Sequence, residues 1–236
     1  MIPILTKDYS TPLPQREEGF IVLIHKETDW TSFDVVKKIR SFLRVKKAGH
    51  AGTLDPFATG LLIIGIGKGT KQLQKFSGLD KSYRAVIRFG IETDTYDRTG
   101  QIIGRKDISG LAYRQLKEAV DSIKGQISQI PPMFSAKKVN GVPLYRLARK
   151  KKEVVRKPVA VRIHKNEIIS WEPPLLTVDL IVSKGTYIRS YAHDLGKLLG
   201  IGAHLQDLTR TAIDKFNLKS AFTIDEFIKF WNQTAS

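Results

Sequence analysis

The chain is organised around the stretch Gly49-His50-Ala51-Gly52-Thr53-Leu54-Asp55-Pro56-Phe57-Ala58-Thr59-Gly60-Leu61-Leu62. This stretch reads as a glycine-punctuated loop that carries one carboxylate and runs into an apolar segment, residues 61–66. Glycine permits turns and close backbone approach, and Pro56 disfavours helical geometry at Asp55. We therefore expect Asp55 at the tip of a turn or extended loop. Such loops often carry catalytic groups, although an Asx-type turn joining two elements explains the same residues.

Length and charge limit the classes of protein to which this sequence can belong. The 236 residues suffice for one large domain or two small ones. Lys and Arg outnumber Asp and Glu by 39 to 23, a net charge of +16 that points to a polyanionic partner. Nucleic acid is the first candidate, and an anionic membrane surface is the alternative. No apolar run is long enough for a transmembrane helix, and residues 1–18 lack the apolar core of a signal peptide.

Residue types that are missing or scattered exclude several chemistries. The absence of cysteine excludes disulfides, thiolate catalysis and Cys-ligated metal, and it fits a cytoplasmic protein. Residues 65–70 resemble a phosphate-binding loop, but Lys68 is followed by Gly69 where that loop needs Ser or Thr. The acidic loop 92–100 fails the EF-hand pattern and reads as a hairpin connection. The histidines are scattered without metal-ligand spacing: His25, His50, His164, His193 and His204. We therefore expect no metal and no cofactor.

Hydrophobic periodicity predicts an α+β protein. Strands are predicted at residues 20–24, 61–66, 81–90, 101–103, 159–171 and 175–183. Helices are predicted at residues 32–43, 70–76, 111–124, 144–152, 188–198 and 224–231. Thr31 or Ser32 is expected to cap the first helix with Asp34 in its first turn, and Thr223 with Glu226 forms a capping box for the last. The first helix is basic on one side and could hold a phosphate, although a solvated face explains it equally.

Several segments, in order, resemble motifs of the TruB family of tRNA pseudouridine synthases. They are the Asp55 loop, K-S-Y-R-A at 81–85, T-D-T-Y-D-R-T-G at 93–100, K-G-T-Y-I-R at 184–189 and L-T-R at 208–210. The resemblance covers roughly residues 20–212. It implies the pseudouridine synthase fold, a mixed and mostly antiparallel sheet flanked by helices, with a basic thumb insertion at about 126–158.

The resemblance also implies roles for individual residues. Asp55 is the implied catalytic carboxylate. The implied substrate-binding residues are His50, Tyr83, Tyr187, Arg189 and Leu208. Tyr83 would stack on the target base, for which an aromatic face is suited. Core packing of Tyr83 and a structural turn role for His50 are the alternatives. If Arg189 pairs with Asp55, it would orient that carboxylate and keep it ionised.

The implied reaction converts uridine to pseudouridine at the T-loop uridine of tRNA, uridine-55. The N1–C1′ bond breaks and C5 bonds to C1′ after the base is flipped out of its stack. Asp55 could attack C1′ as a nucleophile or remove a proton from C2′ as a general base. The implied partner is the T arm of tRNA. We expect a cytoplasmic monomer that needs no metal and no membrane.

The densest cationic run lies in the thumb insertion, where like charges repel and predict poor order without RNA. The candidate RNA-binding residues are Lys71, Lys137, Lys138, Arg146, Arg149, Lys150, Lys151 and Lys152. A solvated surface is the usual explanation of such a run, but Phe134 and Tyr145 are interleaved with the cations, as in many RNA-binding segments.

The expected organisation has three parts. Residues 1–18 form an irregular arm, residues 19–214 the catalytic domain, and residues 215–236 a short C-terminal helix. Many bacterial family members carry a C-terminal PUA domain, for which residues 211–236 are too short. Two other functions fit the same sequence: an RNA chaperone that binds and refolds tRNA without chemistry, and an RNA-guided relative that works within a protein complex.

Overall fold

The computed structural model describes residues 2–10, 12–16, 18–135, 137–139, 141–150 and 154–234, with the backbone alone at 138, 139, 143, 145 and 149. The chain divides into two compact units. The first unit comprises Met1–Tyr83 and Thr209–Ser236, and the second comprises Arg84–Leu208. The division falls within strands β5 (Lys81–Phe89) and β13 (Ala203–Ile213). The expected boundaries of 1–18, 19–214 and 215–236 stay predictions.

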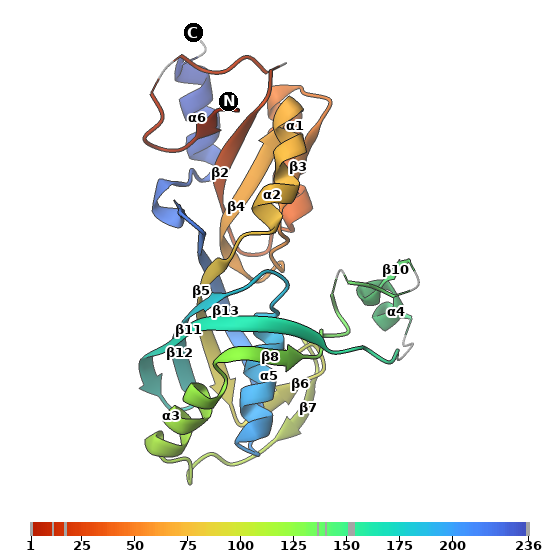
Figure 1. Cartoon of the computed structure of the whole chain (residues 1–236), viewed down its shortest axis with the longest axis vertical. Helices are drawn as coiled ribbons and strands as arrows, with labels where there is room; N and C mark the ends of the chain where they lie inside the picture. The colour runs from red at the N-terminus through yellow and green to blue at the C-terminus, as the bar shows by residue number, and fades with distance from the viewer. Residues whose placement is uncertain are drawn as a thin grey trace. The chain divides into compact units, whose positions relative to one another are not determined.

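The first unit is built on a mixed sheet (Figure 1). Its further strands are β1 (Ile4–Leu5), β2 (Phe20–Lys26), β3 (Ala48–Ala51), β4 (Thr59–Ile66) and β14 (Phe216–Asn217). β4 pairs antiparallel with β2 and β3 and parallel with β13, where Thr209 lies opposite Thr59. β1 pairs parallel with β2, so the expected irregular arm contains one short strand.

In the first unit, the two helices whose caps were predicted begin where those caps place them. The helices described in this unit are α1 (Ser32–Leu43), the 3₁₀ helix η1 (Gly67–Gln72), α2 (Leu73–Ser77), the 3₁₀ helix η2 (Leu218–Ser220) and α6 (Ile224–Thr234). Thr31 and Asp34 form a complete capping box on α1, and Thr223 and Glu226 form both arms of one on α6. The capping predictions are therefore confirmed.

The continuous apolar runs of β2 and β4 are explained by burial on both faces of the sheet. On one face Phe20, Val22 and Ile24 pack with the apolar sides of α1 and α6. On the other face Ile21 and Leu23 pack with residues that include Phe76 and Ile213. A strand covered on both sides needs no polar alternation, so the prediction of a buried strand at 20–24 is confirmed.

The segment Gly67-Lys68-Gly69 allows the turn after β4 to pack closely against β2. We expected a helix over 70–76, but a 3₁₀ helix begins earlier and α2 covers only Leu73–Ser77. A Cβ atom on Gly69 would lie 2.2 Å from the Phe20 carbonyl oxygen, so only glycine lets this turn pack against β2. The segment does join a strand to helical turns, as predicted.

The second unit contains a long antiparallel strand pair, β11 with β12. Its strands are β6 (Ile91–Thr93), β7 (Ile102–Arg105), β8 (Gly125–Gln129), β9 (Lys138–Val139), β10 (Val142–Pro143), β11 (Val159–Glu172) and β12 (Leu175–Val182). The strand order is β13, β5, β12, β11, β8, and both β12 and β8 pair antiparallel with β11. β6 and β7 form the expected hairpin around residues 94–101.

The described residues of the second unit form the helices α3 (Tyr113–Ser122), α4 (Leu144–Arg149) and α5 (Ile188–Leu198). α3 contacts β11 and α5, and its inward residues include Leu116 and Val120, as predicted. α3 and α4 are shorter than expected, while α5 has the expected bounds. The α+β class, with a mixed and mostly antiparallel sheet flanked by helices, is confirmed.

Candidate active site

Asp55 lies on the loop that links β3 to β4 in the first unit. The Ala58 amide donates to the Asp55 carbonyl oxygen at 3.1 Å, which closes a turn around Pro56. Leu54 and Phe57 on either side are buried, while the Asp55 side chain is partly exposed. The expectation of a turn at a loop tip is therefore confirmed, and the carboxylate stands where a substrate could reach it.

Lys26, at the end of β2, binds the main chain of this loop. Its side chain is fully buried. Its ammonium donates to three carbonyl oxygens, those of Glu27 at 2.9 Å, Trp30 at 2.8 Å and Pro56 at 3.1 Å. Burial lowers the pKa of Lys26 to about 8, and the neighbouring carboxylates Asp55 and Asp29 oppose that shift. A positive charge is thus placed next to the loop that carries Asp55.

Ser32, the first residue of α1, fixes the residue before Asp55. Its hydroxyl donates to the Leu54 carbonyl oxygen at 3.1 Å and accepts from the Leu54 amide at 2.9 Å. Both residues are buried, so water does not compete for these bonds. The start of α1 and the Asp55 loop are therefore tied together.

Arg210, on β13, holds the other side of the loop. Its guanidinium is almost completely buried. It donates to the carbonyl oxygens of Leu61 at 2.7 Å, Gly52 at 3.1 Å and Thr53 at 3.4 Å. The planar fork of arginine suits several acceptors at once. Lys26, Ser32 and Arg210 together fix the main chain on both sides of Asp55; we call these three residues the loop clamp.

His50 lies at the start of the same stretch, on β3. Burial, and then the charge of Arg210, lower the pKa of His50, so its ring is neutral near pH 7. Its Nδ1 atom is buried and has no hydrogen-bond partner within the part of the chain that is described. The role of His50 in holding RNA stays a prediction.

Tyr83 and Lys71 also belong to the first unit. Tyr83 is 8% exposed and shares the inward face of β5 with Lys81 and Ala85. Lys81 lies close to the Asp55 loop, because a Cβ atom on Gly52 would be 3.9 Å from its Cε. Lys71 is exposed at the end of η1. Stacking of Tyr83 on a base and RNA binding by Lys71 stay predictions.

Arg189, the second residue of α5, is anchored within the second unit. Its side chain and that of Asp97 are each 5% exposed, and Arg189 Nη1 lies 3.4 Å from Asp97 Oδ2. The guanidinium also donates to the carbonyl oxygens of Thr95 at 3.2 Å and Phe134 at 2.7 Å. Asp97 is a partner that we did not expect from the sequence. The expected pairing of Arg189 with Asp55 stays a prediction.

Asp97 is itself held rigidly. Its Oδ1 atom accepts from the Thr95 hydroxyl at 2.8 Å, the Thr99 amide at 2.9 Å and the Thr99 hydroxyl at 2.6 Å. Hydrogen bonds to a carboxylate are about twice as strong as neutral ones. The loop T-D-T-Y-D-R-T-G therefore acts as a rigid anchor for Arg189, beyond the hairpin connection that we expected.

Tyr187 lies at the N-cap position of α5 and is fixed through its backbone. The buried amide of Gln129 donates to the Tyr187 carbonyl oxygen at 3.0 Å and accepts from the Tyr187 amide at 2.7 Å. Ser190 donates to the Ile130 carbonyl oxygen at 2.8 Å. The end of β8 thus holds the turn that carries Tyr187 and Arg189. Leu208 is buried in the second unit at 7% exposure. Contact of Tyr187 and Leu208 with a base stays a prediction.

The candidate RNA-binding cations of the insertion are described only in part. Lys137 is partly exposed, and Arg146 and Lys150 are exposed. The side chains of Lys138 and Arg149, and the whole of Lys151 and Lys152, lie outside the described residues. The expected poor order of this insertion stays a prediction.

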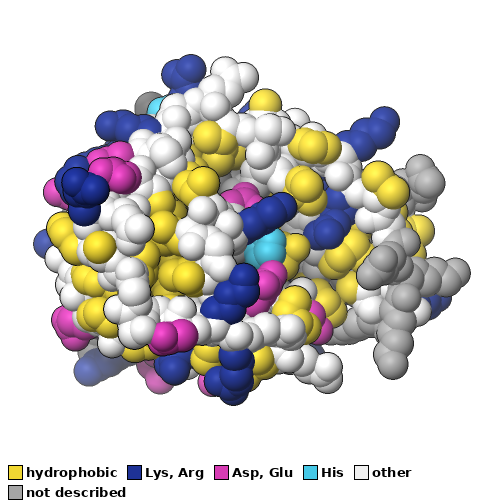
Figure 2. Space-filling view, turned by 90° about the horizontal axis from the view of Figure 1, so that it is seen from below, with side chains coloured by type: hydrophobic (Ala, Val, Ile, Leu, Met, Phe, Trp, Pro, Cys, Tyr) yellow, Lys and Arg dark blue, Asp and Glu magenta, His cyan; other side chains and the backbone are white. Residues whose placement is uncertain are grey.

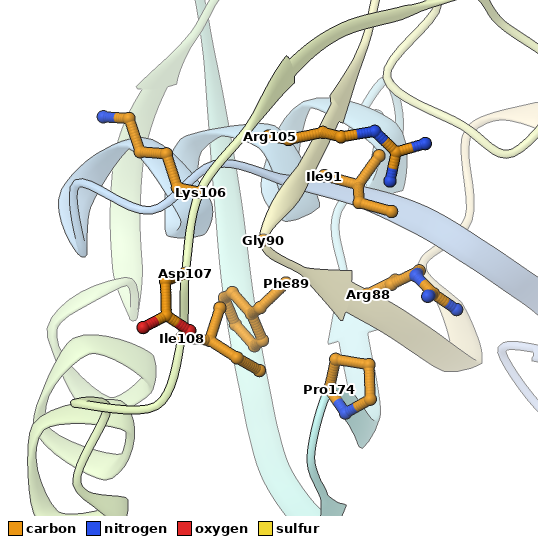
Figure 3. Close-up of a pocket in the computed structure, with 9 residues that line it drawn as sticks. All are labelled: Arg88, Phe89, Gly90, Ile91, Arg105, Lys106, Asp107, Ile108 and Pro174. Carbon is orange, nitrogen blue, oxygen red and sulfur yellow. The ribbon is translucent and has the colours of Figure 1, made fainter.

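A separate pocket of about 330 Å³ opens in the second unit. It is lined by Arg88, Phe89, Gly90, Ile91, Arg105, Lys106, Asp107, Ile108 and Pro174 (Figure 3). Figure 3 shows Arg88 and Arg105 pointing to one side and Lys106 and Asp107 to the other. The pocket includes none of the predicted site residues. Its charged groups do not converge, so we assign no ligand to it.

Sequence reasoning missed the loop clamp as well as Asp97 and Gln129. One signal was available: Lys26 lies two residues after the continuous apolar run 20–24, where a lysine must find partners or leave the core. Arg210 belongs to the L-T-R segment, of which we had singled out only Leu208. Ser32 was considered only as a helix cap.

Comparisons with known proteins identify the relatives of this chain. A family model described as the N-terminal domain of TruB family pseudouridylate synthase matches residues 40–188. A second, described as the C-terminal domain of tRNA pseudouridylate synthase B, matches residues 189–236.

Individual relatives match along most of the chain. The tRNA pseudouridine synthase B of Geobacter sulfurreducens is 46% identical over 88% of this chain and 68% of its own length. Those of Opitutus terrae and Chlorobaculum tepidum are 44% and 43% identical and are covered to 88% and 94%.

A solved structure of a Cbf5–Nop10–Gar1 complex superposes with a TM-score of 0.73 at 26% identity. The match covers 94% of this chain and 57% of that one, so the chain spans little more than half of that relative. The superposition confirms the predicted pseudouridine synthase fold. Because the first family model covers more than half of the chain and the relatives exceed 40% identity, this chain belongs to the TruB family of pseudouridylate synthases.

Proposed function

We propose that this chain isomerises uridine to pseudouridine in the T loop of tRNA, at uridine-55, with Asp55 as the catalytic carboxylate. One observation carries this proposal beyond the family resemblance. The main chain around Asp55 is fixed by the buried loop clamp, while the carboxylate itself is partly exposed. A group held rigidly and left accessible is arranged for reaction rather than for packing.

The reaction rearranges one nucleotide without oxidation or reduction. The N1–C1′ bond breaks, the base turns, and a C5–C1′ bond forms. The hydrogen on C5 leaves as a proton and N1 gains a proton, so atoms and electrons balance. Asp55 serves this reaction either by attacking C1′ as a nucleophile or by removing a proton from C2′ as a general base. In both routes the carboxylate must be ionised, which the positive charge of Lys26 favours.

The remaining site residues would bind the flipped base and the RNA loop. Tyr83 offers an aromatic face for stacking, and Tyr187 and Leu208 offer apolar contacts across the base. Arg189 would orient Asp55 or a substrate phosphate, with Asp97 fixing its guanidinium in place. His50, whose ring is neutral, would hold the RNA loop by hydrogen bonding rather than by charge.

The partner that fits the charge is tRNA. A net charge of +16 supplies sequence-independent affinity for phosphates, and a folded T arm is recognised largely through shape and backbone. None of the helices in the described part of the chain is long and apolar enough to cross a membrane. We propose a cytoplasmic monomer, in keeping with a diffusible tRNA substrate.

Tritium release from C5 tests the proposed function. A tRNA transcript made with [5-³H]UTP would be incubated with wild-type protein, with Asp55→Asn and with Asp225→Asn, which removes an exposed carboxylate on α6. We expect one tritium released per tRNA for wild type and for the control, and a rate at least about 100-fold lower for Asp55→Asn. Equal tRNA binding by all three proteins would show that only chemistry was lost.

Two results would contradict the proposal. Full release by Asp55→Asn would remove the catalytic role of this residue. Tight tRNA binding by wild type with no release would favour the chaperone function instead.

A further inference from the structure

The solvent side of α1 carries an aromatic and cationic stripe. Successive helical residues are rotated by ~100°, so Phe33, Lys37 and Arg40 lie within about 60° of one another along one line of the helix. Arg44 follows at the end of this line, as the left-handed C-cap of α1. All four side chains are exposed, and Phe33 is 62% exposed. We call these four residues the α1 stripe.

In the described part of the chain the stripe cations form no ion pair, and the charge of Asp34, one turn earlier on α1, acts on Lys37. No ion pair or side-chain hydrogen bond joins Lys37, Arg40 or Arg44 to a described residue. The single acid of α1, Asp34, is used in the capping box with Thr31. On α3, by contrast, both cations have acids four residues away.

A mixed surface is found elsewhere on the protein. Figure 2 shows one face on which Lys and Arg side chains are interspersed with Asp, Glu and apolar ones. Such a surface offers a polyanion no continuous line of positive charge along which to bind. The α1 stripe differs because Lys37, Arg40 and Arg44 follow one another without an acid between them on this side and lie beside an exposed ring.

The stripe starts next to the Asp55 loop. Ser32, the neighbour of Phe33, makes both hydrogen bonds to Leu54. From Phe33 to Leu43 the helix extends about 15 Å at 1.5 Å per residue, and Arg44 follows at its end. The three cations cover about 10 Å of that length, which is several times the ~3.4 Å axial spacing of phosphates along one strand of a duplex.

We propose that the α1 stripe is a second contact surface for the substrate RNA, separate from the predicted base-binding residues and from the basic insertion. Lys37, Arg40 and Arg44 bind consecutive phosphates, and Phe33 stacks on an unpaired base next to them. The proposal rests on the proposed function, since it assigns the surface to the same tRNA whose uridine reaches Asp55.

RNA fits this surface better than a membrane does. A helix that lies on a membrane inserts a wide apolar face. The apolar face of α1, which includes Val35, Ile39 and Leu43, is buried in the core of the first unit. One exposed ring among cations suits base stacking with phosphate contacts.

The salt dependence of tRNA binding tests the proposal. We would compare wild type with Lys37→Gln/Arg40→Gln/Arg44→Gln and plot the logarithm of the binding constant against that of salt concentration. Loss of three phosphate contacts should make the slope shallower by about 2–3. Thermal unfolding would confirm that the triple variant folds.

A matched pair of single variants distinguishes RNA binding by the stripe from the general effect of losing one positive charge. Lys37→Gln and Lys38→Gln each remove one exposed lysine from neighbouring positions of α1, but Lys38 points about 100° away from Lys37. We expect a slope change of about 0.7–0.9 for Lys37→Gln and almost none for Lys38→Gln. For the ring, Phe33→Ala should weaken binding about fivefold or more, while Phe33→Tyr should bind as wild type does.

Three results would overturn the proposal. They are an unchanged slope for the triple variant, equal effects of Lys37→Gln and Lys38→Gln, and a triple variant that loses affinity for vesicles of anionic phospholipid but not for tRNA. Absence of tritium release by wild type would contradict the proposed function instead, and the binding slopes would still decide whether the stripe contacts RNA.

Discussion

Replacing Asp97 with Asn would test whether the buried ion pair anchors Arg189. The substitution keeps the Oδ1 atom, which accepts from Thr95 and Thr99. It exchanges the charged Oδ2 for an amide that faces the guanidinium at a distance of 3.4 Å. Two donors then oppose each other, and the charge of Arg189 loses its buried partner.

The expected cost follows from the burial of the pair. Both side chains are 5% exposed, and removing one partner of a buried pair costs about 3–5 kcal/mol. For a chain of this size a loss of 1 kcal/mol lowers the melting temperature by about 2–4 °C. We therefore expect Asp97→Asn to lower the melting temperature of the second unit by about 6–20 °C, measured by circular dichroism.

Two comparisons make this prediction sharp. Asp94→Asn changes an exposed carboxylate on the same loop and should lower the melting temperature by about 2–4 °C at most. Adding Asp97→Asn to Arg189→Gln should cost far less than Asp97→Asn alone, because the buried charge is already gone. Additive effects, or an Asp97→Asn shift no larger than that of Asp94→Asn, would refute the role of the ion pair.

Three further predictions concern single groups. Ser32→Ala removes both bonds to Leu54 and should slow tritium release at saturating enzyme by about tenfold or more without changing tRNA affinity; an unchanged rate would show that the clamp is only structural. Because burial lowers the pKa of Lys26 to about 8, the unfolded chain holds more protons between pH 8 and about 10.4. Stability should therefore rise with pH there, by up to about 1.4 kcal/mol per pH unit, and Lys26→Met should abolish the rise in urea titrations. Burial raises the pKa of Asp194 to about 6, so its contribution to stability falls as pH rises from about 4 to 6. Asp194→Asn should then stabilise the protein by about 1–3 kcal/mol at pH 7 and hardly at all at pH 3.5, and equal effects at both pH values would contradict this.

Local features of the fold could be predicted because neighbouring residues carry the signal. Thr31 with Asp34, and Thr223 with Glu226, place the starts of α1 and α6. The alternation along β5 predicts its inward face, including Tyr83. The position of Asp55 in a turn followed from Pro56 and the flanking glycines.

The contacts that hold the site could not be predicted in the same way. Asp97 and Arg189, or Ser32 and Leu54, come from distant parts of the chain, and no local period specifies their pairing. Arg210 lies on β13, a strand that we did not predict. Its burial becomes evident only when the carbonyl oxygens of the Asp55 loop are placed around it.

The central claim is that this chain forms pseudouridine at one T-loop uridine through Asp55. The most direct measurement maps pseudouridine by chemical labelling and reverse-transcription stops on an unmodified tRNA transcript after incubation with wild type or Asp55→Ala. We predict a single stop at the T-loop uridine with wild type and none with the variant. Stops at other uridines, or the same stop with Asp55→Ala, would contradict the account.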